Sequence, residues 1–157
     1  MGSTMQTVSS GAMTASDYIQ HLGLEKHPEG GYYREVYRHS ALSSFEGFDG
    51  PRNLSTSIYF LMTHEASSAM HRIKSDEIWY YHDGDPLEII IQNEAGVEYI
   101  VRLGKALETG CVMQYVVPAG CWFGARVADG GAFTLVGCQV TPGFDFRDFE
   151  LMHPSDV

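Results

Sequence analysis

After residue 31 the chain consists of short apolar-rich segments separated by polar turns, and YYREVYRH, residues 32–39, alternates in a way that suits a strand with two different faces. The segment DEIWYYH, residues 76–82, is typical: β-branched and aromatic residues dominate it, and successive side chains of such a strand point to opposite faces. Similar segments recur at a spacing near the roughly 8–12 residues expected of a β-sandwich or barrel. The expected strands cover residues 32–39, 55–63, 76–82, 87–93, 97–103, 112–118, 121–127 and 132–140.

Helix signals are confined to the N-terminal region. Thr14 or Ser16 can cap a short helix that carries Ile19 and Leu22 on one face, and Gly23 is placed to end it. The sequence therefore predicts an all-β fold with one short N-terminal helix.

The segment HPEGGYY, residues 27–33, interrupts the helical pattern, because its glycine pair favours a sharp turn. A chain of 157 residues is long enough for one substantial core, and no internal boundary or repeat divides it. We expect a flexible tail over residues 1–15 and a single domain over residues 16–157.

Charge and composition exclude several classes of protein. A formal net charge of −10 disfavours binding to nucleic acids and to anionic membranes, and no window reaches the roughly 20 apolar residues of a membrane helix. Cys111, Cys121 and Cys138 are odd in number and lie in apolar stretches, which is typical of reduced, buried thiols. These features predict a cytoplasmic protein.

The candidate chemistry lies in HRIKSDEIWYYHDGD, residues 71–85. Glu77 shares a strand face with Trp79 and Tyr81, and a carboxylate in such apolar surroundings is costly to bury without a partner. His71 lies six positions earlier. We therefore expect His71 and Glu77 to meet inside the barrel as the catalytic pair.

Two short motifs resemble the signatures of the cupin superfamily. His71, Glu77 and Gly84 fall on the spacing of the first signature, and Pro118 and Gly120 in PAGCWFGA match the second. HPEGGYYREVYR, STSIYFLMT, LVGCQVTPGFDF and DFEL extend the resemblance, over about residues 17–152, to the cupin subfamily known as domain of unknown function 985, or Cupin 5. It implies a double-stranded β-helix, or jelly roll, of the kind that deoxysugar-nucleotide epimerases also use, and a homodimer.

The resemblance also bears on metals. A cupin metal site usually uses three histidines and one carboxylate, but Ile73 and Phe123 stand where two of the histidines would be. His71 and Glu77 alone fall short of the three protein ligands of a typical catalytic site, and His82 lies on the opposite strand face. We therefore expect no metal or other cofactor; if a metal binds, His71 and Glu77 are its expected ligands.

Without a metal, His71 and Glu77 form a coupled acid–base pair. Burial raises the pKa of a carboxyl group and a neighbouring imidazolium lowers it, so the pair can hold a proton near neutral pH. Tyr33, Tyr59 or Tyr81 could supply a second acid. The leading hypothesis is an isomerase, epimerase or lyase that acts on a sugar-like or keto-acid substrate.

The expected ligand is a small molecule, anionic or sugar-like, that an arginine, aromatic rings and an amide would hold. The predicted substrate-binding residues are Arg34, Tyr59, Trp79, Tyr81 and Gln114. The resemblance places Glu29 and Arg34 at the cavity mouth, and TPGFDF is expected to close one end with Phe144 and Phe146. Two alternatives stay open: a metal-dependent cupin enzyme, and a ligand-binding or sensory module without turnover.

Overall fold

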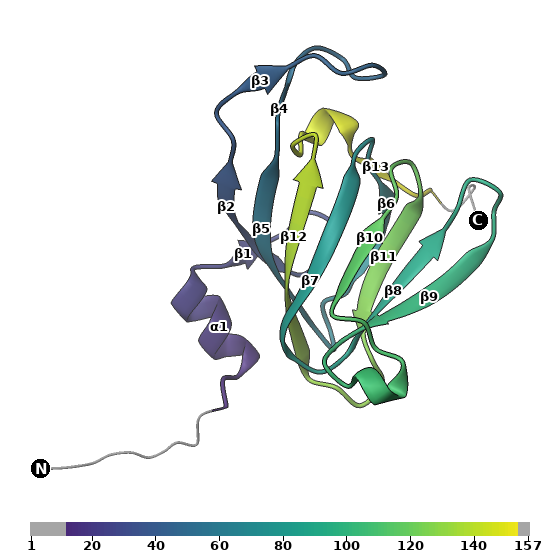
Figure 1. The fold of residues 1–157 in the computed structure, drawn as a ribbon. Helices are drawn as coiled ribbons and strands as arrows, with labels where there is room; N and C mark the ends of the chain where they lie inside the picture. The colour runs from purple at the N-terminus through teal and green to yellow at the C-terminus, as the bar shows by residue number, and fades with distance from the viewer. Residues whose placement is uncertain (1–11, 154–157) are drawn as a thin grey trace, which may run out of the picture.

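The computed structural model describes residues 12–153, which form two large antiparallel sheets that face each other (Figure 1). One sheet has the order β1-β2-β5-β12-β7-β10 and the other β13-β6-β11-β8-β9. The all-β prediction is confirmed. Eight of the strands are those predicted: β2 (Tyr32–Arg38), β5 (Thr56–Thr63), β7 (Asp76–Gly84), β8 (Leu87–Gln92), β9 (Glu98–Leu103), β10 (Gln114–Val117), β11 (Trp122–Val127) and β12 (Phe133–Thr141).

The pattern did not predict the shorter elements. Strand β6 (Ser68–Arg72) comes from SAMHR, which has few β-branched or aromatic residues, and its place between β11 and β13 is decided by pairing. The others are β1 (Glu25–Lys26), β3 (Leu42–Ser43), β4 (Arg52–Asn53), β13 (Glu150–Leu151) and the 3₁₀ helices η1 (Leu107–Thr109) and η2 (Phe146–Asp148).

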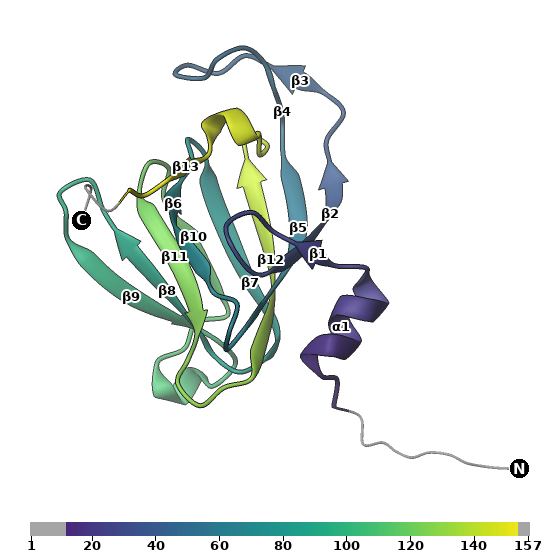
Figure 2. The same ribbon diagram turned by 180° about the vertical axis from the view of Figure 1, so that it is seen from behind.

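Helix α1 (Ala15–Leu22) begins one residue inside the predicted tail, most of which lies outside the described residues. Thr14 caps it through a capping box with Asp17, and Gly23 ends it in the left-handed conformation at φ 66°. The helix packs outside the six-stranded sheet (Figure 2), where its apolar face meets Leu61 and Leu135. No helix among the described residues has the length and hydropathy that a membrane span requires.

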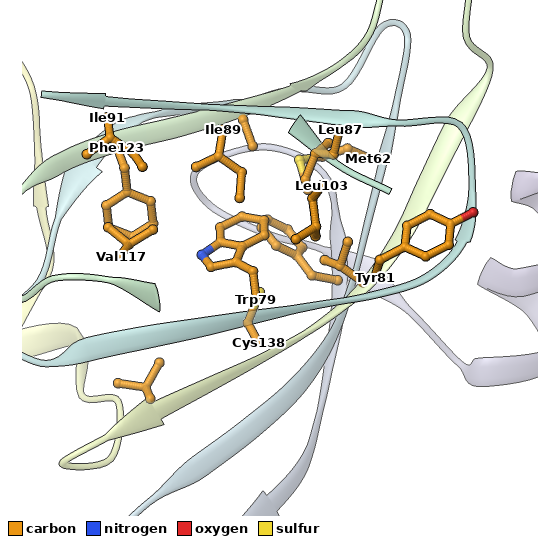
Figure 3. Close-up of a cluster of buried hydrophobic side chains, with 14 of the residues drawn as sticks. Met62, Trp79, Tyr81, Leu87, Ile89, Ile91, Leu103, Val117, Phe123 and Cys138 are labelled. Carbon is orange, nitrogen blue, oxygen red and sulfur yellow. The ribbon is translucent and has the colours of Figure 1, made fainter. Parts of the chain in front are cut away.

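Side chains at alternate strand positions point into the space between the two large sheets. In β7, Glu77, Trp79 and Tyr81 are buried while Asp76 and His82 are exposed. Trp79 is fully buried, and Figure 3 shows its indole among aliphatic side chains from the facing sheet. The interior around Trp79 is therefore a packed core.

The C-terminal segment crosses from one sheet to the other. Strand β12 ends at Thr141 in the six-stranded sheet, and β13 pairs with β6 at the edge of the other sheet. Residues 142–149 connect the two (Figure 2) and bring Phe144, Phe146 and Phe149 against one another, with ring centroids 4.8–6.4 Å apart.

A buried ion pair holds this segment in place. The Arg52 guanidinium donates to both carboxylate oxygens of Asp148 at 2.9 and 2.8 Å, and the two side chains are only 1% and 4% exposed. Arg52 also donates to the carbonyl oxygens of Asp49 and Pro51. A bidentate pair of this kind fixes geometry as well as charge, so η2 is tied to the loop before β4.

Replacing Asp148 should therefore destabilise the fold. Asp148→Asn leaves a buried guanidinium without its counter-charge, and we expect the free energy of unfolding in urea to fall by about 3–5 kcal/mol. In the control, Glu88→Gln breaks the more exposed pair with Arg126 (55% and 24% exposed) and should cost less than about 1 kcal/mol. Equal effects of the two substitutions would contradict this role for Asp148.

Candidate functional site

A cavity of about 450 Å³ lies between the two sheets, beneath the C-terminal segment. Its size is within the range of small-molecule sites. The lining combines carboxylates, histidines, an arginine and aromatic rings. The residues are His27, Glu29, Tyr33, Glu35, Arg38, Thr56, Ile58, His71, Ile73, Glu77, Cys138, Val140, Phe144, Asp145, Phe146 and Phe149.

The turn between β1 and β2 places Glu29 in this cavity. Gly30 has φ 111°, and a Cβ atom there would lie 2.0 Å from the carbonyl oxygen of Ser67. The Ala69 N–H donates to the Glu29 carbonyl at 2.9 Å. Only glycine permits so close an approach, so the turn packs on the backbone leading into β6 and brings Glu29 to His71.

Both ring nitrogens of His71 face oxygen acceptors. Nδ1 lies 2.7 Å from the Ala69 carbonyl oxygen, and Nε2 lies 2.7 Å from Oε2 of Glu29. Since a carbonyl can only accept, Nδ1 carries a proton, and Nε2 faces the Glu29 carboxylate, with which it forms an ion pair when the ring is protonated. Burial lowers the pKa of His71, but Glu29 and the Ala69 carbonyl outweigh this, and the pKa is raised. The Phe123 and Phe149 rings pack on the imidazole at 4.2 and 5.3 Å.

Glu77 has a different environment. Burial raises its pKa, His71 lowers it and the Glu29 carboxylate raises it again, with a result of about 7. Its hydrogen-bond partner is the Cys138 thiol, a weak donor whose own pKa burial and Glu77 raise well above the usual value. Glu77 therefore holds an exchangeable proton near neutral pH inside the cavity.

His27 is held in its neutral form. The Glu29 backbone N–H donates to Nδ1 at 3.1 Å, so this nitrogen acts as an acceptor and the proton resides on Nε2. Burial lowers the pKa of His27, and this outweighs the nearby Glu29 carboxylate. Its ring meets that of Tyr33 edge-on at 4.5 Å.

A β-bulge in β2 turns a charged pair toward the cavity mouth. The pairing of β2 with β5 shifts register between Glu35 and Tyr37, so both Glu35 and Arg38 line the cavity although their separation is odd. Arg38 donates to both carboxylate oxygens of Glu35 at 3.1 and 2.7 Å and to Oδ1 of Asn53 at 2.9 Å. Both side chains of the pair are more than a third exposed.

Comparison with known families identifies the fold. Residues 16–152 match the family model Cupin_5, described as cupin superfamily (DUF985). The chain belongs to this cupin family. The predicted jelly-roll fold is thereby confirmed.

Three similar proteins have names that state no activity. A hypothetical protein from Leishmania major has a solved structure that is 42% identical, with a TM-score of 0.85 over 92% of this chain and 90% of that one. A protein from Shewanella oneidensis is 43% identical, with a TM-score of 0.81 over 90% and 85% of the two chains. An uncharacterised protein of Saccharomyces cerevisiae is 29% identical over 146 residues, 85% of this chain and 72% of that protein.

More distant cupins share the fold alone. Oxalate decarboxylase from Bacillus subtilis is 17% identical, with a TM-score of 0.58 over 94% of this chain and 33% of that one. At this identity the likeness carries no information about the reaction.

The residues of this cupin do not fit the metal site of the superfamily. Ile73 and Phe123, at two of the usual ligand positions, have no donor atoms, and Phe123 fills the space against the His71 ring. Both nitrogens of His71 already face other oxygen atoms, Nδ1 the Ala69 carbonyl and Nε2 the Glu29 carboxylate. Across residues 12–153 no three histidine, cysteine or acidic side chains are grouped as metal ligands.

Of the predicted site residues, His71 and Glu77 line the cavity, but Trp79 and Tyr81 do not. These two share the strand face of Glu77, as expected, yet lie further along β7, where the interior is packed. The Tyr81 hydroxyl donates to the Gly84 carbonyl at 2.6 Å and is thus already partnered. The structure therefore places Trp79 and Tyr81 in the packed core and outside the lining of this cavity.

Arg34, Tyr59 and Gln114 are also absent from the lining. Arg34 pairs with Tyr59 across β2 and β5, so both side chains are on the outer face, where Arg34 donates to the Leu22 carbonyl at the end of α1. Gln114 is exposed on the edge strand β10, opposite Tyr80. The structure therefore does not bring Arg34, Tyr59 and Gln114 into this cavity, because these strand positions face away from the interior.

The sequence analysis missed part of the lining. Glu29 was expected at the cavity mouth and is instead the partner of His71. Tyr33, one of three candidate acids, is the one in the lining, and strand alternation from it would have found Glu35. His27 and Arg38 had no signal in the pattern, since a turn places one and a bulge the other. Phe144, Asp145 and Phe146 line the cavity, as the closing loop implied.

The raised pKa of Glu77 should make stability depend on pH. The folded protein holds this proton more tightly than the unfolded chain, so stability is greatest below the usual pKa of 4.5 and falls as pH rises to about 7. The decrease is at most about 1.4 kcal/mol per pH unit. The free energy of unfolding, measured by urea denaturation, should be compared for wild type and Glu77→Gln at each pH. The wild-type value minus the variant value should fall between pH 4.5 and about 7. The exposed control Glu98→Gln should keep a constant difference, and a flat difference for Glu77→Gln would contradict the shifted pKa.

Proposed function

We propose that this cupin is a small-molecule isomerase, epimerase or lyase that works by proton transfer without a metal. The observation that carries the proposal is the burial of Glu77 in the cavity near the contact between His71 and Glu29, an environment that raises the pKa of Glu77 to about 7. Perturbed acids of this kind are a hallmark of sites for acid–base catalysis, and a base works best with its pKa near the working pH.

In the proposed reaction Glu77 is the general base. Its ionised carboxylate takes a proton from the carbon next to a substrate carbonyl, and the C–H electron pair moves to the carbonyl oxygen to give an enolate. Return of a proton to the opposite face of that carbon gives an epimer. Expulsion of a leaving group from the neighbouring carbon gives an elimination product instead.

The other groups stabilise the enolate and supply the second proton. His71 acts through its positive charge, because its two N–H groups face Ala69 and Glu29. Glu29 is a positioning residue that keeps this charge in place. Tyr33 lines the cavity. Its hydroxyl group is the candidate acid that donates to the enolate oxygen or returns the proton to carbon.

Deuterium exchange tests the proposal before the product is known. The protein is incubated in D₂O with keto acids, free uronates, 4-keto sugar nucleotides and amino sugars, and loss of the α-proton signal is followed by NMR. We expect exchange with at least one class, and a fall of about 10²-fold or more in Glu77→Gln. His71→Gln should also slow it, whereas Glu98→Gln should not. Melting temperatures confirm that each variant is folded.

Two results would overturn this function. One is wild-type exchange rates in both Glu77→Gln and His71→Gln on a compound that the protein turns over. The other is a compound that protects against thermal unfolding and is recovered without exchange, which indicates a binding module.

Chelation should leave the activity intact. Because the donor atoms do not fit a cupin metal site, dialysis against EDTA should not change the exchange rate measured above. Loss of exchange on dialysis, with recovery on adding back manganese, iron, nickel or zinc, would favour the metal-dependent alternative.

A further inference from the structure

Both cationic side chains in the cavity lining are already paired with lining carboxylates. The Nε2 atom of His71 is 2.7 Å from Glu29, and Arg38 makes a bidentate contact with Glu35. The remaining basic group, His27, uses Nδ1 as an acceptor and is neutral. An anionic ligand would therefore have to break an existing ion pair to gain a positive partner.

The lining carboxyl groups are not balanced in the same way. Asp145 is paired with Arg147 at 3.0 Å. Glu77 is then the lining carboxyl group that has no ion-pair partner among the described residues. No basic group among the described residues lies within 4.0 Å of the Glu77 carboxyl, and the Cys138 thiol is its weak hydrogen-bond partner. Glu77 is also more than nine-tenths buried. A strong donor with a positive charge is the partner that this group lacks.

The walls of the cavity favour the same kind of ligand. Phe144, Phe146 and Phe149 contact one another from the C-terminal segment, and Tyr33 lines the cavity from β2. The faces of aromatic rings carry partial negative charge and attract ammonium groups. These rings line the same cavity as the Glu77 carboxyl group, which lacks a cationic partner within 4.0 Å among the described residues.

We propose that the ligand of this cavity carries a protonated amine that pairs with Glu77, and that the cavity discriminates against carboxylates and phosphates. This inference rests on the proposed function and narrows its substrate class. It departs from the anionic ligand that the sequence suggested and remains compatible with a sugar-like one, in the form of an amino sugar.

Matched probes that differ only in charge test the proposal. Benzylamine, benzyl alcohol and benzoate share a ring that fits the phenylalanine wall, and glucosamine, glucose and glucuronate form a second series on a sugar ring. Dissociation constants are measured by calorimetry and checked by protection against thermal unfolding. In at least one series the amine should bind about tenfold or more tightly than the carboxylate, with the neutral compound between them.

Two variants locate the source of the preference. Glu77→Gln should weaken binding of the amine about tenfold while changing that of the neutral compound little. Glu35→Gln frees the charge of Arg38 and should reduce the amine-to-carboxylate ratio, mainly through tighter carboxylate binding. Glu98→Gln, outside the cavity, should leave the ratio unchanged.

Stronger binding of benzoate or glucuronate than of the matching amine would overturn the proposal. So would the failure of both amines to protect the protein at millimolar concentrations, or an amine affinity that Glu77→Gln leaves unchanged. These binding results are independent of turnover. Deuterium exchange that depends on Glu77 would therefore support the proposed function even if the charge preference failed.

Discussion

The contact between the Glu29 carboxylate and the His71 imidazole governs the electrostatics of the cavity. It occupies the nitrogen that a metal ion would need and keeps a positive charge where the ring packs between Phe123 and Phe149. Burial raises the pKa of the nearby Glu77 carboxyl group, His71 lowers it, and the Glu29 carboxylate offsets part of the effect of His71, with a result of about 7. The same ion pair thus bears on both the metal question and the protonation of Glu77.

This contact exists because of backbone packing rather than strand pairing. Gly30 lies directly against the Ser67 carbonyl, and the Ala69 N–H binds the Glu29 carbonyl, so the turn and β6 fit each other closely. The C-terminal segment covers the same region and is tied down by Arg52 and its partner Asp148. Charges buried in this way are tolerated when they are paired, and their pairing fixes the geometry of the cavity.

The fold of the superfamily is retained while the donor atoms of its usual metal site are replaced. Ile73 and Phe123 contribute hydrocarbon at positions where cupin enzymes usually carry histidine, and both are buried. The likeness to oxalate decarboxylase is one of strand arrangement, since identity is only 17%. Function in this family therefore has to be argued from the side chains in each cavity.

Local pattern alone determined the all-β class, eight of the strands and the faces of β7, because side chains alternate along any strand. Together with the spacing of the first cupin signature, it also selected His71 and Glu77 for the cavity. Alternation does not show which residues on the inner face of a strand line a cavity and which pack in the core. Trp79 was therefore predicted to contact the ligand, although it is buried in the core. The contact of Glu29 with His71 and the inward turn of Arg38 were decided only by the tertiary structure. Both depend on a close backbone approach or a bulge between segments distant in sequence, and periodicity carries no information about either.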